Sequence, residues 1–217
     1  MLKSKISIGT ASFEKGYGIN NSSGFSEKKI SQLIKFIKKN KIYSIDTAIS
    51  YKSVEKKLGK TNLVKFKLYT KIPKLPKRCK NLKNWLNKSI NKSLIDLNIK
   101  SFEGIFIHNI SDLLNHKYSN ELYDYLINLK RKGIAKKIGV SIYDFSNFFR
   151  ALKKFKFDIV QLPFNILDRR LLLNNNIKRI KEKKMEIHVR SVFLQGLLLQ
   201  DYVNIPKYFK KQKKIFK

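Results

Sequence analysis

Cysteine is almost absent from this sequence: Cys79 is the one cysteine in 217 residues. No disulfide can form within the chain and no metal site with paired cysteine ligands can exist, so we predict no bound metal. Long apolar runs are absent too, since no segment approaches the roughly 18 apolar residues of a membrane span, and the amino terminus lacks the apolar run of a secretory signal. These absences predict a cytoplasmic protein without a membrane partner.

Acidic residues are scarce, with 15 Asp and Glu against 48 Lys and Arg, which gives a formal net charge of +33. Such an excess often indicates a polyanionic partner such as nucleic acid. Here it is nearly all lysine and extends from Lys3 to Lys217, so we favour solvated lysine faces and expect no specific nucleic-acid partner. The densest lysine run lies at about 201–217, which we interpret as a basic tail whose composition favours disorder.

Proline and glycine, with four and nine residues, form no linker that would divide the chain. We therefore expect a single domain over residues 1–217. Short apolar segments alternate with amphipathic helical patterns along its length, which is typical of parallel βα architecture. One such helix is expected from about Glu27, with Ser26 as its N-cap. Two others are expected where Leu82 to Leu97 form an apolar stripe and where the apolar residues Phe148, Leu152 and Phe155 recur. The expected strands are residues 5–10, 42–46, 68–72, 104–108, 137–141, 159–163 and 186–191.

The number of these units favours an incomplete barrel. We count about seven strand and helix units, where a closed (β/α)8 barrel needs eight over some 250 residues. A doubly wound sheet is the structural alternative, but its phosphate-binding G-x-G-x-x-G pattern is missing after the first strand. The sequence therefore predicts an α/β protein with a parallel sheet, a (β/α)8 TIM-type barrel that lacks the eighth βα unit.

Polar side chains follow three of the expected strands at their carboxyl ends, where barrels of this kind carry their active sites. Asp46 ends the second strand and Tyr51 lies in the loop after it, while Lys71 and His108 end the third and fourth strands. Each residue also has an ordinary structural interpretation: a turn cap, a packed tyrosine, a surface lysine or a hydrogen-bonded histidine. Their occurrence together, in this order and at one rim, favours a catalytic set.

The same residues resemble the catalytic tetrad of the aldo-keto reductase superfamily. The pattern consists of D-T-A-x-x-Y at 46–51, a T-K strand end at 70–71 and an apolar strand that closes in His108. Three more segments resemble family motifs: KGIAKKIGVS at 132–141, VQLPFN at 160–165 and QGLL at 195–198. The resemblance extends from Ile8 to Leu199.

This resemblance implies an oxidoreductase that reduces a carbonyl group (an aldehyde, ketone or sugar) with hydride from NADPH or NADH. Hydride arriving at carbon builds negative charge on oxygen, which must be stabilised and protonated. Tyr51 would supply the proton, and Lys71 would lower the pKa of that phenol. Asp46 would provide the counter-charge of the lysine, and His108 would donate a hydrogen bond to the substrate oxygen.

The family pattern also implies the cofactor-binding residues. Ser141 and Gln161 match positions that bind the nicotinamide carboxamide, and Arg190 stands where many members have an aromatic residue that stacks on the nicotinamide ring. Ser191 and Gly196 belong to the same carboxy-terminal segment and are included in the predicted cofactor site. A guanidinium plane can also stack on a ring, so we expect binding to survive this departure.

The larger departure from the family is a short carboxyl end, where members hold the adenosine half of the cofactor. An exposed parallel edge would remain, and we expect an oligomer to be one way of covering it. Two other functions stay open at this point: a catalytically silent or truncated relative that acts as a cofactor-binding or regulatory subunit, and a lysine-rich binder of nucleic acid. Retention of all four tetrad residue types favours the enzyme.

Overall fold

The computed structural model describes residues 5–19, 23–114, 117–201, 203, 205 and 209. Most of the predicted basic tail at 201–217 lies outside the described residues.

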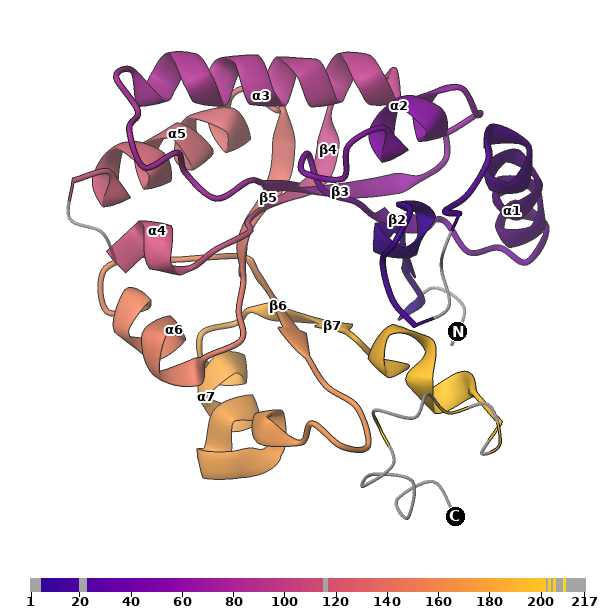
Figure 1. Cartoon of the computed structure of the whole chain (residues 1–217). Helices are drawn as coiled ribbons and strands as arrows, with labels where there is room; N and C mark the ends of the chain where they lie inside the picture. The colour runs from indigo at the N-terminus through magenta and orange to yellow at the C-terminus, as the bar shows by residue number, and fades with distance from the viewer. Residues whose placement is uncertain are drawn as a thin grey trace.

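Seven parallel strands form one sheet in the sequential order β1 to β7 (Figure 1). Each strand pairs with the next one along the chain, as in Tyr69↔Gly104 between β3 and β4 and Gln161↔His188 between β6 and β7. This arrangement confirms the prediction of a TIM-type barrel without its eighth unit. The strands are β1 Ile8–Gly9, β2 Ser44–Asp46, β3 Lys67–Ile72, β4 Phe102–Ile107, β5 Ala135–Ser141, β6 Ile159–Pro163 and β7 Glu186–Arg190.

Helices cover the outside of the strands (Figure 1). The first begins where it is predicted, because the side chain of Ser26 accepts a hydrogen bond from the backbone N–H of Lys29. The helices are α1 Glu27–Lys39, α2 Val54–Gly59, α3 Leu82–Leu97, α4 Ser111–Leu114, α5 Ser119–Arg131, α6 Phe145–Ala151 and α7 Asn176–Glu182. Three 3-10 segments complete the pattern within the described residues: η2 Ala11–Phe13, η3 Arg170–Asn175 and η4 Leu194–Leu199.

β2 begins at Ser44, two residues later than expected, and β1 and α6 are also shorter than the sequence predicts. β1 has two residues, because it lies at an edge of the sheet and pairs only with β2. α6 ends at Ala151, so Phe155 lies beyond the helix, where its ring packs against Tyr123 at a centroid distance of 4.8 Å. In both places the period of apolar residues indicates burial, and tertiary contacts decide where the regular hydrogen bonding stops.

The middle of the barrel interior is filled by a layer of packed side chains. Tyr69, Phe106 and Ile159 form a buried cluster, and the ring of His188 lies 4.7 Å from Tyr69 and 5.8 Å from Phe106. Gly139 completes the layer without a side chain, since a Cβ there would lie 2.5 Å from Cγ1 of Ile159. The barrel is therefore solid at this level, and any ligand must bind above the layer, at the carboxyl ends of the strands.

The strands β1 and β7 are the two edges of the sheet, and the segments that follow them approach each other. The backbone N–H of Ile19 donates to the carbonyl of Gln195, 3.3 Å away. Figure 1 shows η4 on the same side of the barrel as the amino-terminal elements. An oligomer that covers this edge stays a prediction. Across the residues that the structure describes, no helix is long and apolar enough to span a membrane.

Candidate active site

Five of the nine predicted site residues lie two positions after a member of the interior layer. The pairs, with the layer residue first, are Tyr69 and Lys71, Phe106 and His108, Gly139 and Ser141, Ile159 and Gln161, and His188 and Arg190. Successive side chains of a strand alternate between its two faces, so residues two apart point to the same side. The five side chains therefore point into the barrel one level above the aromatic layer, at its carboxy-terminal mouth.

Asp46 and Lys71 form an ion pair at the centre of this level. The Nζ of Lys71 lies 2.6 Å from Oδ2 of Asp46 and also donates to the carbonyl of Thr47 at 2.8 Å. Lys71 is 1% exposed, and this burial lowers its pKa below the ordinary lysine value while the Asp46 carboxylate opposes the shift. Gln161 reaches the other carboxylate oxygen: its Nε2 donates to Oδ1 of Asp46 at 2.9 Å.

Tyr51 lies beside this pair, at the turn between β2 and α2. Its ring centroid is 5.7 Å from Nζ of Lys71 and 6.4 Å from the ring of His108. Burial raises the pKa of the Tyr51 phenol above its ordinary value, and the negative charge of Asp46 raises it further. The net shift of the Tyr51 pKa is therefore upward, opposite to the lowering that we expected from Lys71. The physical reason is that Asp46 compensates the ammonium at 2.6 Å, whereas the phenol has lost most of its contact with water.

His108 follows the last residue of β4, where its backbone N–H continues the ladder by donating to the carbonyl of Ile72 at 3.1 Å. Burial lowers the pKa of the imidazole to about 4, and the neighbouring Lys71 charge adds to the effect. The ring is therefore neutral near pH 7 and carries one N–H. A neutral imidazole can donate one hydrogen bond to a substrate oxygen without adding a buried charge.

This shift predicts that acid destabilises the protein through His108. In the unfolded chain His108 takes up a proton near pH 6.5, whereas in the folded chain it does so only near pH 4. Protonation therefore favours the unfolded state, so the free energy of unfolding is highest above pH 6.5 and falls as the pH drops. Between pH 7.5 and pH 5 the loss should be about 2 kcal/mol. Urea unfolding at both pH values should show this extra loss for the wild type relative to His108→Asn. Equal pH dependence of the two proteins would contradict the prediction.

Two buried polar atoms near the ion pair have no hydrogen-bond partner within the described part of the chain. They are Oε1 of Gln161 and Oγ1 of Thr47. The Nε2 of Gln161 is held by Asp46, so its Oε1 faces away from the carboxylate as a free acceptor. Ser141 pairs with Gln161 in the sheet register and is buried beside it. An amide NH2 group, such as that of a nicotinamide, fits an unpaired acceptor of this kind.

The remaining three predicted residues lie at the end of β7 and in η4. The Arg190 guanidinium lies 3.8 Å from the ring centroid of Tyr143 and donates to the carbonyl of Ile142 at 3.0 Å. Ser191 adopts a left-handed backbone with φ of 59°. Gly196 has a φ of 95°, and a Cβ there would meet no described atom within 4 Å. Glycine is therefore favoured at position 196 by the positive φ of this turn and not by a lack of space.

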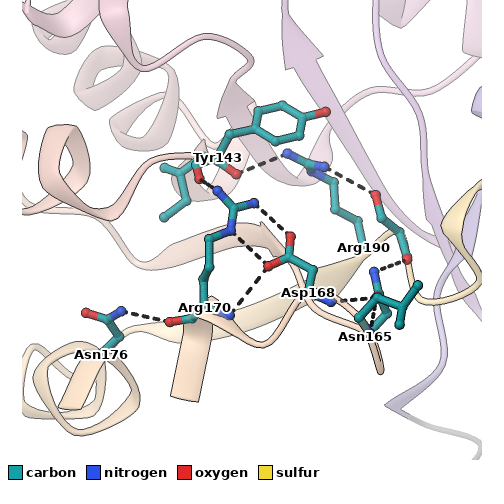
Figure 2. Close-up of polar contacts among 9 residues, drawn as sticks. Tyr143, Asn165, Asp168, Arg170, Asn176 and Arg190 are labelled. Carbon is teal, nitrogen blue, oxygen red and sulfur yellow. Dashed lines mark hydrogen bonds and ion pairs between the residues drawn. The ribbon is translucent and has the colours of Figure 1, made fainter. Parts of the chain in front are cut away.

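Figure 2 shows a polar cluster that sequence reasoning missed. Asn165 accepts from the backbone N–H groups of Leu167 and Asp168 and donates to the carbonyl of Ser191 at 3.0 Å. Asp168 holds Arg170 through two hydrogen bonds of 2.9 and 2.7 Å, and Arg170 donates to the carbonyl of Tyr143 at 2.7 Å. The cluster connects the loops after β5, β6 and β7. The signals in the sequence are Asn165, which closes the VQLPFN motif, and the polar residues that follow it.

Comparison with known proteins decides the family. The model of the Aldo/keto reductase family matches residues 5–216. The chain belongs to this family. Membership supports an oxidoreductase. A search of curated proteins found no match.

Solved aldo-keto reductase structures share the fold. The holo form of an aldo-keto reductase from Bacillus halodurans has a TM-score of 0.72 at 21% identity, with 89% of this chain and 64% of that chain covered. An aldo-keto reductase from Bombyx mori in complex with NADP has a TM-score of 0.66 at 17% identity, with 86% and 62% covered. The glycerol dehydrogenase of Gluconobacter oxydans has a TM-score of 0.67 at 17% identity, with 89% and 61% covered. The chain thus spans less than two thirds of the length of these three proteins.

Proposed function

We propose that this aldo-keto reductase reduces the carbonyl group of a small molecule with hydride from NADPH or NADH. The observation that carries the proposal is the buried Lys71–Asp46 pair in the barrel mouth, with the ring of Tyr51 beside Lys71 and the ring of His108 next to Tyr51. A fully buried lysine is rare in a structural role, because its burial opposes the charged form. A catalytic role explains why this lysine, among so many exposed ones, lies inside the barrel.

The unpaired Oε1 of Gln161 and the adjacent Ser141 would hold the carboxamide of the nicotinamide. Arg190, with Ser191 and Gly196 beyond it, would bound the same ring and the chain that follows it. When bound, the nicotinamide supplies the hydride. The NADP complex of the Bombyx mori relative supports a nicotinamide cofactor for this chain.

Tyr51 would act as the proton donor. Its raised pKa means that the phenol keeps its proton through the neutral range. An alkoxide is a far stronger base than a phenolate, so the proton moves downhill once hydride has reached carbon. His108, neutral near pH 7, would donate its N–H to the same oxygen and orient it. Lys71 would stabilise the phenolate that is left, since its ammonium is held 5.7 Å from the ring centroid by Asp46.

The second candidate is a catalytically silent relative that binds the cofactor as a regulatory subunit. The raised pKa of Tyr51 favours it, because a phenol with a higher pKa is a weaker acid. The two functions share the cofactor site and differ in the proton transfer.

One experiment separates the two functions. NADPH is added to the purified protein and its fluorescence is followed, after which 4-nitrobenzaldehyde is added and the loss of NADPH absorbance is measured. We expect saturable binding and a steady loss of absorbance. Binding without turnover over a panel of aldehydes would leave the silent relative, and the absence of binding would contradict both functions.

A further inference from the structure

Glu55 is a buried acidic residue that the proposed mechanism does not use. It lies in the first turn of α2 and is 3% exposed. No cation of the described residues forms an ion pair with it, and Lys92, whose charge acts on Glu55, is paired with Asp96. Burial raises the pKa of the Glu55 carboxyl above its ordinary value. A buried carboxyl group without a counter-ion is costly, so hydrogen bonds must stabilise it.

Two hydroxyl groups supply these hydrogen bonds, one to each carboxyl oxygen. Oγ1 of Thr70 donates to Oε1 of Glu55 at 2.7 Å, and Oγ of Ser93 donates to Oε2 at 2.7 Å. Both donors are completely buried. They belong to different elements, since Thr70 lies on β3 and Ser93 on α3. The Glu55 carboxyl group therefore connects α2 both with a strand of the sheet and with the neighbouring helix (Figure 1).

The two connections differ in what supports them. α2 and α3 also meet at Gly59, where a Cβ would lie 2.0 Å from the carbonyl oxygen of Asp96. The backbones of the two helices are thus in direct contact at the end of α2. Within the described part of the chain, the bond between Thr70 and Glu55 is the only hydrogen bond that joins α2 to β3. Its loss would free α2 from the strand, whereas loss of the Ser93 bond would leave the helices in contact.

Both ends of the Glu55–Thr70 bond lie next to proposed catalytic residues in the chain. Thr70 directly precedes Lys71 on β3, and because successive side chains alternate, Thr70 points out of the barrel where Lys71 points in. Glu55 follows Tyr51 by four residues. The carbonyl of Tyr51 accepts from the backbone N–H of Val54, the first residue of α2, at 2.8 Å. Tyr51 is therefore attached to the same turn of α2 that carries Glu55.

The backbone hydrogen bonds that continue the pairing of β2 with β3 stop before Tyr51. The last of them runs from the N–H of Ile49 to the carbonyl of Lys71 and is 3.3 Å long. The chain then turns, and the N–H of Tyr51 donates to the carbonyl of Ala48 at 2.9 Å. The place of the Tyr51 phenol relative to Lys71 therefore depends on how α2 lies on β3.

We propose that Glu55 is a positioning residue for carbonyl reduction: its hydrogen bond with Thr70 holds α2 on β3 and thereby keeps the phenol of Tyr51 beside Lys71. A displacement of a reacting group by about 1 Å can lower a rate by about 10²-fold. Glu55 therefore acts on kcat through Tyr51 and touches neither substrate nor cofactor. This inference rests on the proposed function, because it assigns the proton transfer to Tyr51.

The test compares Thr70→Val with Ser93→Ala, which removes an equally short hydrogen bond from the same carboxyl group. Thr70→Val keeps the shape of the side chain and loses the donor. We expect it to lower kcat about tenfold, with KM and the Kd for NADPH unchanged. Thr70→Ser, which keeps the hydroxyl, should recover most of this loss. Ser93→Ala should keep kcat within about twofold, although its urea midpoint should fall as much as that of Thr70→Val.

Two double variants identify the route of the effect. Glu55→Met removes both hydrogen bonds, so the addition of Thr70→Val should lower kcat no further. Thr70→Val should likewise leave the residual kcat of Tyr51→Phe unchanged. Additive losses in either pair would overturn the inference. If Glu55→Met does not fold, as judged by circular dichroism, the pair with Tyr51→Phe decides.

Equal losses of kcat in Thr70→Val and Ser93→Ala would show a general structural role for Glu55, and an unchanged kcat in Thr70→Val would show no role in positioning; both overturn the inference. If the wild type reduces no aldehyde, the proposed function fails separately. Tyr51 is then followed by fluorine NMR of protein labelled with 3-fluorotyrosine, its resonance being the one missing from Tyr51→Phe. A resonance that shifts in Thr70→Val and not in Ser93→Ala supports the positioning role, and any other pattern contradicts it.

Discussion

Replacing Tyr51 by Phe is expected to lower kcat for aldehyde reduction by about 10²–10⁴-fold, which is the usual contribution of a positioned proton donor. The substitution removes one oxygen and keeps the half-buried ring that lies against Lys71 and His108. The Lys71–Asp46 pair and the Gln161 amide do not depend on that oxygen, so the Kd for NADPH should stay unchanged. Absorbance kinetics give kcat, and cofactor fluorescence gives the Kd.

The control for Tyr51→Phe is Tyr125→Phe. Tyr125 also has a buried phenol whose hydroxyl forms a hydrogen bond, here to Asn87 at 2.9 Å, but it lies on α5 outside the barrel. Removal of that hydroxyl should leave kcat within about twofold, since no proposed catalytic group is near it. If Tyr51→Phe retains the turnover of the wild type, Tyr51 is not the proton donor and the raised pKa of its phenol is a structural consequence of burial alone.

Replacing Asp46 by Asn is expected to destabilise the fold by about 3 kcal/mol at pH 7, because it removes the counter-charge of a fully buried ammonium. Lys71 would lose the charged carboxylate of Asp46 as a hydrogen-bond acceptor and keep the carbonyl of Thr47. Its pKa, already lowered by burial, should fall further, so the folded state would hold fewer protons than the unfolded state. Stability of the variant should then rise with pH toward the ordinary lysine pKa, and its deficit should be smaller at pH 9.5 than at pH 7. The kcat of Asp46→Asn for aldehyde reduction should also be lower than that of the wild type.

The control for Asp46→Asn is Glu27→Gln, which makes the same change from acid to amide in the exposed pair of Glu27 and Lys60. Both side chains of that pair are more than half exposed, and such pairs contribute less than about 1 kcal/mol. Urea unfolding of the three proteins at the two pH values provides the comparison. A deficit of Asp46→Asn that is no larger than that of Glu27→Gln would show that the burial of Lys71 does not depend on the carboxylate.

Much of the fold follows from local pattern. The strand at 159–163 is predicted with the bounds of β6, because the apolar residues Ile159, Val160 and Leu162 are followed by the loop that Phe164 begins. The helix with apolar residues from Leu82 to Leu97 is likewise observed as α3. β1 and α6 are predicted too long, because the end of an element depends on the contacts of a neighbouring element, which periodicity does not contain.

The candidate site could be predicted only in part. The identities of Asp46, Lys71 and His108, and their place at one rim, follow from strand ends and the motif. The hydrogen bond from Gln161 to Asp46 does not, because it joins residues 115 positions apart. The same holds for the cluster of Asn165, Asp168 and Arg170, whose polar residues look like an ordinary loop until the neighbouring strands bring Tyr143 and Ser191 to it.

The sequence by itself determined which chemical groups gather at the mouth of the barrel. The alternation of strands and helices sets a parallel sheet, all strands of a parallel sheet end at one rim, and side chains two residues apart face the same side. Only the tertiary structure decided how those groups are charged. The direction of each pKa shift depends on burial and on distances between strands, so the protonated phenol of Tyr51 and the neutral ring of His108 came from packing and not from motif.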